Sequence, residues 1–298
     1  MDPPERLFLS DKLVSQQQLD NIISHVGEFG PDQRAGIDGC LHRISAMRAI
    51  NGDIYGLTLR VGRSVVGLSE IISDLLYDCK LSGKSFLILG GPGTGKTTII
   101  REITRILSGP LNLNVVVVDT SNEICGDGDV PHESVGLGRR MMVPSIGEQE
   151  RVMIECLQNH TPEVLVIDEI GRKKEVLAAM TVKQRGVQIV ASAHGNLVDL
   201  VKNKALNGLV GGVEAVLLGD EAARENFGRK IKEQRVAEPL FEVVIELKKG
   251  DLAQWNIYTN LSQTVDAILD GRSYSYQVRT RDTIGRVWVE YYHKRGDH

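Results

Sequence analysis

The 298-residue sequence lacks three features that would place it in particular classes of protein. No apolar run approaches the ~18 residues of a membrane helix, so we expect no membrane span. The N-terminus, Met1 to Ser10, carries acids and prolines, not the basic-then-apolar pattern of a targeting signal, so we see no targeting peptide. Cysteines are few and form no CxxC pair, which predicts free thiols in a reducing compartment: Cys40, Cys79, Cys125 and Cys156.

An excess of positive charge is also missing. The formal net charge is −4, so the overall charge does not favour nucleic-acid binding, and any basic surface must be local. Hydrophobic residues make up 42% and charged residues 25% of the chain, as in an ordinary globular protein. The length allows one large domain with additions, or two domains.

Residues 84–219 alternate between strand and helix patterns. Short apolar runs predict strands over 85–89, 115–118, 164–167, 187–191 and 213–218. Helical spacing predicts helices over 97–107, 148–158 and 174–179. Four consecutive valines, residues 115–118, suit a strand that is buried on both faces. This alternation predicts an α/β core with a parallel sheet covered by helices on both faces.

Two smaller α+β regions flank this core. Residues 1–83 show a helix (15–26), two strands (40–48 and 55–61) joined by an Asn51-Gly52 turn, and a second helix (68–78). Residues 220–298 show a charged helix (221–235), strands (241–247 and 254–258), a short helix (262–269) and a last segment of β character (273–292). We therefore expect domain boundaries near residues 83 and 219.

The strongest chemical signal is a glycine-rich loop between the first core strand and its helix. The segment has the GxxxxGK[ST] spacing and comprises Gly90, Gly91, Pro92, Gly93, Thr94, Gly95, Lys96 and Thr97, followed by Thr98. Glycines let backbone N–H groups turn inward around phosphate oxygens, and the helix adds its positive end. Lys96 is predicted to reach the β- and γ-phosphates of ATP, and Thr97 to ligate Mg²⁺.

The second signal is an acidic pair, Asp168-Glu169, at the end of the strand over 164–167. Asp168 is predicted to hold the magnesium at the carboxyl end of its strand. Glu169 is placed to polarise the attacking water. The alternative, a solvated loop, is weakened by the phosphate loop about 70 residues earlier.

Polar residues also follow two other core strands. After the valine strand, Glu123 is a candidate for a catalytic or water-positioning role, with a structural role equally open, and Asp119 could instead cap the turn. After the strand over 187–191, His194 precedes Gly195 and is a candidate for contacting the γ-phosphate, although lone histidines are often structural.

Arginines are candidates for neutralising charge in the transition state, in their own chain or from a neighbouring subunit. Arg139 and Arg140 lie in a glycine-rich loop, and Arg172 follows the acidic pair; Arg60 and Arg63 lie in the N-terminal region. For any single one of them, a surface arginine without a catalytic role is the simpler interpretation. We retain Arg139 and Arg172 as the leading candidates.

Four segments in this order resemble the stage III sporulation protein AA family and its chloroplast and cyanobacterial relatives, which are AAA-type P-loop ATPases. The segments are GGPGTGKTT, VVVVDTSNEICG, VLVIDEIGR and IVASAHG. Residues 41–63, 241–247 and 265–269 resemble the plastid-type branch. The core is more distantly similar to type II and type IV secretion ATPases, where the matching positions are Glu123, Glu169 and His194.

The resemblance implies a RecA-like (ASCE) fold, ATP and Mg²⁺ as cofactors, and a homo-oligomeric ring, expected to be a hexamer. It also implies a plastid or cytoplasmic location. Plastid and cyanobacterial relatives often end in a single-stranded nucleic-acid-binding domain with an Arg-x3-His signature, and this chain contains no such signature. Residues 277–295 are nevertheless locally basic and contain aromatic side chains.

Three functions fit these patterns. The first is a ring ATPase that couples hydrolysis to moving or remodelling a macromolecular partner, and the second is a nucleotide-dependent single-stranded nucleic-acid-binding factor with slow hydrolysis. The third, a small-molecule kinase, fits least because Glu169 is placed to activate water. We expect an ATP hydrolase.

Overall fold

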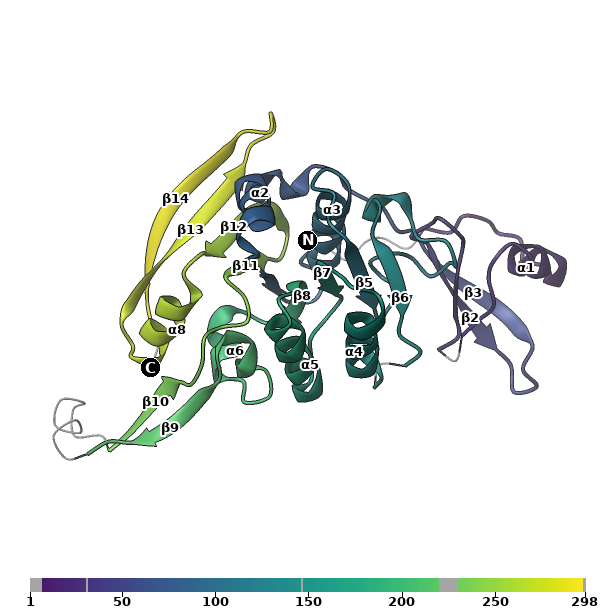
Figure 1. The fold of residues 1–298 in the computed structure, drawn as a ribbon. Helices are drawn as coiled ribbons and strands as arrows, with labels where there is room; N and C mark the ends of the chain where they lie inside the picture. The colour runs from purple at the N-terminus through teal and green to yellow at the C-terminus, as the bar shows by residue number, and fades with distance from the viewer. Residues whose placement is uncertain (1–6, 31, 146, 220–229, 297–298) are drawn as a thin grey trace. The chain divides into compact units, whose positions relative to one another are not determined.

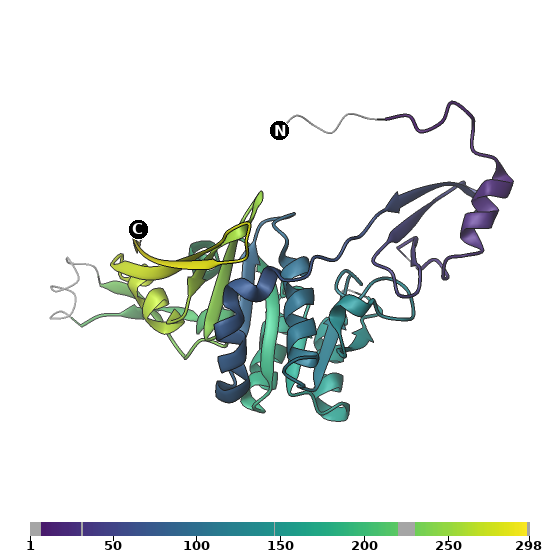
Figure 2. The ribbon, with the colours of Figure 1, turned by 90° about the horizontal axis from the view of Figure 1, so that it is seen from above.

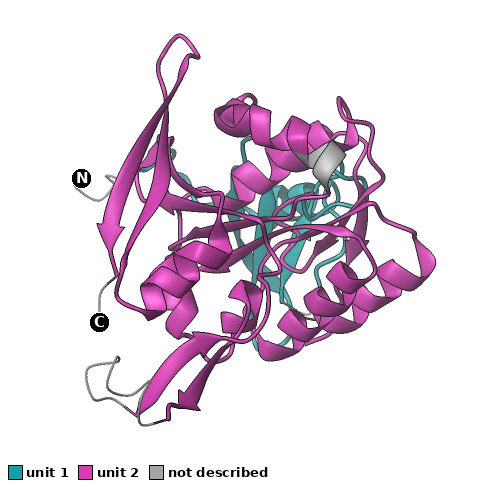
Figure 3. Cartoon of the chain, turned by 60° about the vertical axis from the view of Figure 1, so that its left-hand side comes forward, with its two compact units in different colours: residues 1–63, 126–132 teal, residues 64–125, 133–298 magenta. Residues whose placement is uncertain are grey.

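The computed structural model describes residues 7–30, 32–145, 147–219 and 230–296. The chain forms two compact units, residues 1–63 with 126–132 and residues 64–125 with 133–298 (Figure 3). The first division therefore falls after residue 63, and not near residue 83, and there is no division near residue 219. The reason is that the helices before residue 83 and the strands after residue 219 share hydrophobic clusters with the core sheet.

The first unit confirms the predicted helix and strand pair. Its helix begins after Ser15, whose hydroxyl accepts from the backbone N–H of Gln18 in a capping box. The Asn51-Gly52 turn joins the second and third strands of an antiparallel sheet in the order β1-β2-β3, and Gly52 has a φ of 92°. The elements are α1(Gln16–Ile23), β1(Arg34–Gly36), β2(Arg43–Arg48) and β3(Ile54–Arg60).

The second unit is built on a nine-stranded sheet in the order β14-β13-β12-β11-β4-β8-β7-β5-β6 (Figure 1). Six neighbouring strands are parallel: β11(Val243–Lys248), β4(Phe86–Gly90), β8(Gln188–His194), β7(Val164–Ile167), β5(Val115–Asp119) and β6(Arg139–Met142). Three antiparallel strands extend this sheet: β12(Asp251–Tyr258), β13(Ser273–Arg281) and β14(Val287–Arg295).

The strand order establishes the fold class. Strand β8 lies between β4, which precedes the glycine-rich loop, and β7, which ends in the acidic pair. A parallel sheet with one strand inserted between these two is the RecA-like (ASCE) arrangement, so the predicted α/β fold is confirmed. Because the strands are parallel, the loop and the acidic pair emerge at the same edge of the sheet.

Both faces of the sheet are covered by helices, because alternate strand residues point to opposite sides. Phe86 and Ile88 of β4 pack with η1(Leu68–Ile72), α2(Ser73–Ser82) and α3(Lys96–Ser108) in one cluster. Leu87 and Leu89 belong to the other cluster, with α4(Gln149–Asn159), α5(Lys173–Gln184), α6(Leu197–Lys202) and α8(Leu261–Leu269). Short 3₁₀ turns complete the unit: η2(Glu133–Val135) and η3(Asn207–Val210).

Two predictions about the segment after the core are wrong. Residues 213–218 were expected to be the last strand of the core sheet, but β9(Val213–Leu217) pairs instead with β10(Ile231–Arg235) in a separate two-stranded sheet. The predicted helix over 221–235 is therefore a strand in its last part, while residues 220–229 lie outside those described. Backbone pairing with β9 outweighs the helical charge pattern there, and β11 occupies the place beside β4.

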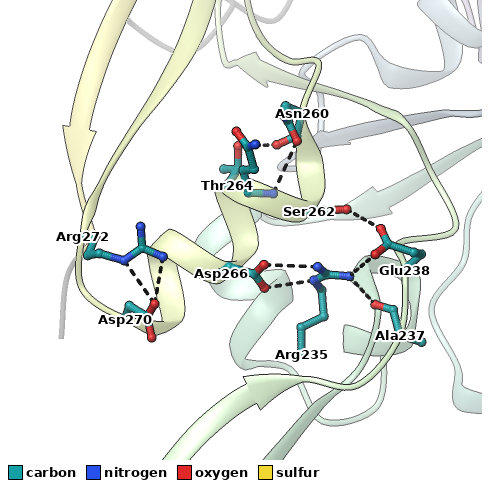
Figure 4. A network of polar contacts seen from close by, with 10 residues as sticks. Arg235, Ala237, Glu238, Asn260, Ser262, Thr264, Asp266, Asp270 and Arg272 are labelled. Carbon is teal, nitrogen blue, oxygen red and sulfur yellow. Dashed lines mark hydrogen bonds and ion pairs between the residues drawn. The ribbon is translucent and has the colours of Figure 1, made fainter. Parts of the chain in front are cut away.

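A polar network connects β10 and the segment after it to α8 (Figure 4). The Arg235 guanidinium donates to both carboxylate oxygens of Asp266, from Nε at 3.0 Å and from a terminal nitrogen at 3.1 Å. Arg235 also pairs with Glu238 at 3.2 Å, and Glu238 accepts from the Ser262 hydroxyl at 2.6 Å. A bidentate arginine fixes direction as well as distance, so the network sets the position of β10 on α8.

Two further expectations can be compared with the described residues. In that part of the chain, no helix is long and apolar enough to cross a membrane. Cys40, Cys125 and Cys156 are free thiols, and burial raises the pKa of the Cys156 thiol to about 11. The side chain of Cys79 lies outside those described.

Candidate nucleotide-binding site

The glycine-rich loop has the structural context that its motif requires. Strand β4 is fully buried, the loop follows directly, and α3 begins at Lys96. Gly93 and Gly95 have φ angles of 72° and 92°, in the left-handed region that favours glycine. The Thr94 hydroxyl donates to the Gly91 carbonyl at 3.0 Å and holds the loop closed. The loop therefore presents the N-terminus of a 13-residue helix to a ligand.

Lys96 is buried at the centre of this loop, with 9% of its surface exposed. Its Nζ donates to the carbonyls of Gly90 and Gly91, at 2.9 and 3.1 Å, and lies 3.4 Å from Nδ1 of His194. Burial lowers the pKa of Lys96, and the negative charge of Glu169 and then of Asp168 opposes this shift. A buried ammonium that is hydrogen-bonded to backbone carbonyls is a strong site for an anion.

His194 connects Lys96 with the acidic pair. At the end of β8, its Nδ1 faces Lys96, and its Nε2 lies 3.0 Å from Oε2 of Glu169. The side chains of His194 and Glu169 are both about half exposed, so solvent reaches this pair. The structure thus brings together three residues that were predicted from three separate segments.

Asp168 is the buried member of the acidic pair, with 7% of its surface exposed. Burial, followed by the charges of Asp119, Glu123 and Glu169, raises the pKa of Asp168 to about 8. The Ser192 hydroxyl of β8 donates to the Asp168 backbone carbonyl at 2.5 Å and fixes the end of β7. A divalent cation bound here would offset the repulsion between these carboxylates.

The turn after β5 separates the roles of Asp119 and Glu123. Asp119 is fully buried, and its carboxylate accepts the backbone N–H groups of Glu123, Ile124 and Cys125 at 3.1, 3.2 and 2.8 Å. Asp119 therefore shapes the turn. The Glu123 carboxylate is the acceptor for the Thr97 hydroxyl at 3.5 Å, which places it beside the predicted magnesium ligand.

Two residues that sequence reasoning missed hold this arrangement. Arg101, on the buried face of α3, donates from Nε to the Ile124 carbonyl at 2.7 Å and from a terminal nitrogen to the Glu123 carbonyl. Gln149, only 2% exposed, accepts from the Thr120 hydroxyl at 2.9 Å and donates to the Glu169 carbonyl at 2.8 Å. An arginine among the apolar residues of α3 was the available signal for Arg101.

The candidate arginines lie in several places, and Arg139 lies far from the glycine-rich loop. The Arg139 guanidinium donates to the Asn114 side chain and the His160 carbonyl, at 2.8 and 2.7 Å, at the amino end of β5. That is the opposite end of the strands from the loop. Arg172 precedes α5 and is exposed. Burial raises the pKa of Asp119 to about 6, and its hydrogen bond from the Cys125 N–H and the charge of Arg140 oppose this rise. Arg60 and Arg63 belong to the other compact unit.

The donor set fits a magnesium nucleotide better than a metal held by protein alone. Among the described residues, no three His, Cys, Asp or Glu side chains converge on one metal position. The Thr97 hydroxyl instead contacts the Glu123 carboxylate, whose charge also reaches Asp168. Magnesium in such sites takes its other ligands from phosphate and water. The half-buried Thr98 follows in the first turn of α3.

Sequence comparison places the chain among known proteins. The profile of the family described as "Sporulation stage III, protein AA" matches residues 34–218. The chain belongs to this family. Among the family's relatives, the "Uncharacterized protein ycf45" of Porphyra purpurea is 46% identical over 96% of this chain and 50% of its own length. The "Protein SEEDLING PLASTID DEVELOPMENT 1" of Arabidopsis thaliana is 48% identical over 91% of this chain and 39% of its own length.

The chain therefore spans about half or less of the length of these curated relatives. Among solved structures, the X-ray structure of the Legionella pneumophila ATPase DotB aligns over 86% of this chain and 68% of that chain, with 14% identity and a TM-score of 0.49. The family assignment rests on the sequence match, and the fold on the strand order.

Proposed function

We propose that this protein binds ATP with magnesium at the glycine-rich loop and hydrolyses it. The observation that carries the proposal is the chain of contacts from Lys96 through His194 to Glu169 at the mouth of the loop. It joins a buried cation, which suits the phosphates, to a solvent-accessible carboxylate, which suits a water molecule. Gly91, Gly93 and Thr94 carry the backbone N–H groups that would surround the phosphates.

Each residue has a separate task in this proposal. Lys96 exchanges its contacts with the loop carbonyls for the β- and γ-phosphate oxygens, which form stronger charge-assisted hydrogen bonds. Thr97 and Asp168 would hold magnesium, which supplies neutralisation of phosphate charge when bound. Thr98 would donate to the phosphate nearest the nucleoside.

Glu169 is the proposed water-activating residue. Its Oε2 lies within 3.0 Å of His194 Nε2, so the imidazole can orient the carboxylate and sense whether the γ-phosphate is present through Lys96. Glu123, beside Thr97, is the second candidate for positioning water or the magnesium shell. The kinase alternative is not favoured, because Glu169 directly follows Asp168, at the position that the resemblance to secretion ATPases assigns to water activation.

We further propose that the active form is a homo-oligomeric ring, such as a hexamer, that couples hydrolysis to remodelling or moving a macromolecular partner. Arg172, which is exposed just before α5, supports a role for an arginine across a subunit interface. The names of the relatives, which include a plastid development protein, support a plastid location. The macromolecular partner would then be a protein or a nucleic acid, as it is for AAA-type ATPases.

The second candidate is a nucleotide-dependent factor that binds single-stranded nucleic acid. It is favoured by the β13–β14 hairpin at the sheet edge (Figure 2), where Trp288 and Tyr291 are 58% and 71% exposed. Exposed aromatic rings can stack on bases, and the neighbouring Arg286, Lys294 and Arg295 can contact phosphates.

The test follows ATP turnover and particle mass together. The purified full chain is titrated with Mg–ATP, with and without single-stranded DNA or RNA, while phosphate release and oligomer mass are measured. The ring ATPase predicts turnover and a ring-sized mass that depends on nucleotide. Binding of nucleic acid with little turnover would favour the second candidate, and no affinity for ATP would remove both.

A further inference from the structure

The side of the phosphate loop away from the carboxylates is formed by the end of β11. This strand runs parallel to β4 on the opposite side from β8, with Val243 to Glu246 aligned with Phe86 to Leu89. The turn that follows β11 therefore arrives next to the loop. All the acidic residues of the site and His194 come from β5, β7 and β8, on the other side.

Leu252, just after this turn, packs directly on the loop. A Cβ built on Gly95 would lie 2.5 Å from Cδ2 of Leu252, so the leucine covers the position where the loop enters α3. The carbonyl of Leu252 accepts from the indole Nε1–H of Trp255 at 2.9 Å, and Trp255 is fully buried. The leucine backbone is thus anchored to the core, while its side chain remains 38% exposed.

We propose that Leu252 forms the apolar platform for the nucleoside part of the bound nucleotide. This inference rests on the proposed nucleotide binding and specifies how the non-phosphate half of the ligand is held. The terminal phosphate and magnesium belong on the side of Asp168 and Glu169, so a linear nucleotide must direct its nucleoside toward β11. There, an anchored and partly exposed leucine offers the apolar surface that a base ring needs.

The turn itself is suited to this position. Lys248 pairs with Asp251 across a tight turn in which Gly250 has a φ of 84°. Lys248 and Lys249 are exposed in this turn. Their positive charge would attract ATP and tripolyphosphate alike. The Leu252 side chain, in contrast, would add affinity only for a ligand that carries a nucleoside. This difference supplies the test.

The experiment compares ATP with inorganic tripolyphosphate, each with Mg²⁺, on the full chain. For Leu252→Ala, we expect ATP affinity to fall by about 5- to 10-fold, because three side-chain carbons leave the contact, and tripolyphosphate affinity to stay unchanged. Leu252→Met should keep most of the ATP affinity. Leu177→Ala, at an exposed leucine on α5, is the matched control and should change neither ligand.

The outcomes separate the two proposals. Equal losses for ATP and tripolyphosphate would mean that Leu252 only supports the loop, and unchanged ATP affinity would mean that the nucleoside lies elsewhere; either result overturns the inference. Wild-type protein that binds neither ligand would overturn the proposed function instead. If Leu252→Ala does not fold, Leu252→Gln, which keeps the length but is polar, should show the same selective loss for ATP.

Discussion

At the scale of single residues, the Lys96 ammonium gives the sharpest test of the site. Its present partners are two neutral carbonyls and a histidine nitrogen. Replacing these by phosphate oxygens gains charge-assisted hydrogen bonds, which are each worth about 1.5–3 kcal/mol. We expect Lys96→Ala to weaken binding of an ATP analogue by about 10- to 100-fold, measured by titration calorimetry. Lys202→Ala, at an exposed lysine of α6, is the control, and unchanged affinity in a folded Lys96→Ala variant would contradict the site.

Glu169→Gln tests catalysis separately from binding. Glutamine keeps the shape and can still contact His194, but it cannot take a proton from water. We expect ATP affinity to remain within a few-fold of wild type, while phosphate release falls by about 10²- to 10⁴-fold. Glu155→Gln, on exposed α4 surface, should leave both unchanged. Turnover at the wild-type rate would shift the assignment to Glu123, where the same substitution is then made.

Which site residues the sequence could reveal depends on how local their roles are. The loop and Asp168-Glu169 are continuous segments attached to strands, so they could be recognised before the structure was known. The choice between roles for Asp119 and Glu123 could not, because it depends on which carboxylate turns inward to the N–H groups of residues 123–125. Gln149 makes its contacts between segments about 20 to 30 residues away and has no local signature.

At the scale of elements, an ion pair joins the first helices of the second unit to the outer strands. Arg279 of β13, almost fully buried, donates to the Asp74 carboxylate of α2 at 3.0 Å and to the Ile71 carbonyl at 2.9 Å. Burial alone would raise the pKa of Asp74, but the hydrogen bonds and charge of Arg279 outweigh it and hold this pKa below its usual value. The pair therefore favours the folded state only while Asp74 is ionised.

This predicts a pH-dependent effect of Asp74→Asn. Because the folded pKa lies below the unfolded value of about 3.9, the contribution is fully present above that value and is lost as the pH falls through the folded pKa. We expect a loss of about 1 kcal/mol at pH 7, limited by the exposure of Asp74. The difference from wild type should be the same at pH 5 and shrink toward pH 3.

Urea unfolding at several pH values measures this difference. Glu70→Gln is the matched control, since Glu70 pairs at 2.7 Å with Arg281, which is much more exposed than Arg279. Its effect should be smaller at every pH. A destabilisation by Asp74→Asn that persists unchanged at pH 3 would show that packing, not charge, is responsible.

Most core strands could be predicted because their residues are buried on both faces and form continuous apolar runs. The core helices could be predicted because their apolar residues recur at helical spacing. The failures occur where the choice of pairing partner has no local signature. Nothing local distinguishes β9, which pairs with β10, from β11, which enters the core sheet beside β4. Strand β6, with the sequence Arg139-Arg140-Met141-Met142, was missed because an edge strand needs no apolar run.

At the scale of the whole molecule, the proposed ring predicts complementation between defective subunits. Lys96→Ala removes the loop function, and Arg172→Ala removes the arginine that is proposed to act on the neighbour. Each alone should be nearly inactive if its arginine acts across the interface, where such a group is worth roughly 10³-fold or more in rate. Mixed subunits should regain some phosphate release, because some interfaces then contain both intact halves.

Protein concentration provides the control for this prediction. Turnover per wild-type subunit should rise with concentration as rings form by mass action. Mass measurement with a bound ATP analogue should show the ring directly. A monomer at high concentration, with turnover that does not depend on concentration and no recovery on mixing, would contradict the ring.

The place of β11 beside β4 also has a consequence for biosynthesis. The strand that carries the phosphate loop leaves the ribosome more than 150 residues before the strand that completes its other side. Since nascent domains fold from the N-terminus, β4 must wait with one edge unpaired while the intervening residues are translated. During that interval the loop also lacks Leu252. The nascent chain therefore passes through a period in which a fully apolar strand is open to mispairing, and chaperone binding at this stage would protect it until residues 243–252 emerge.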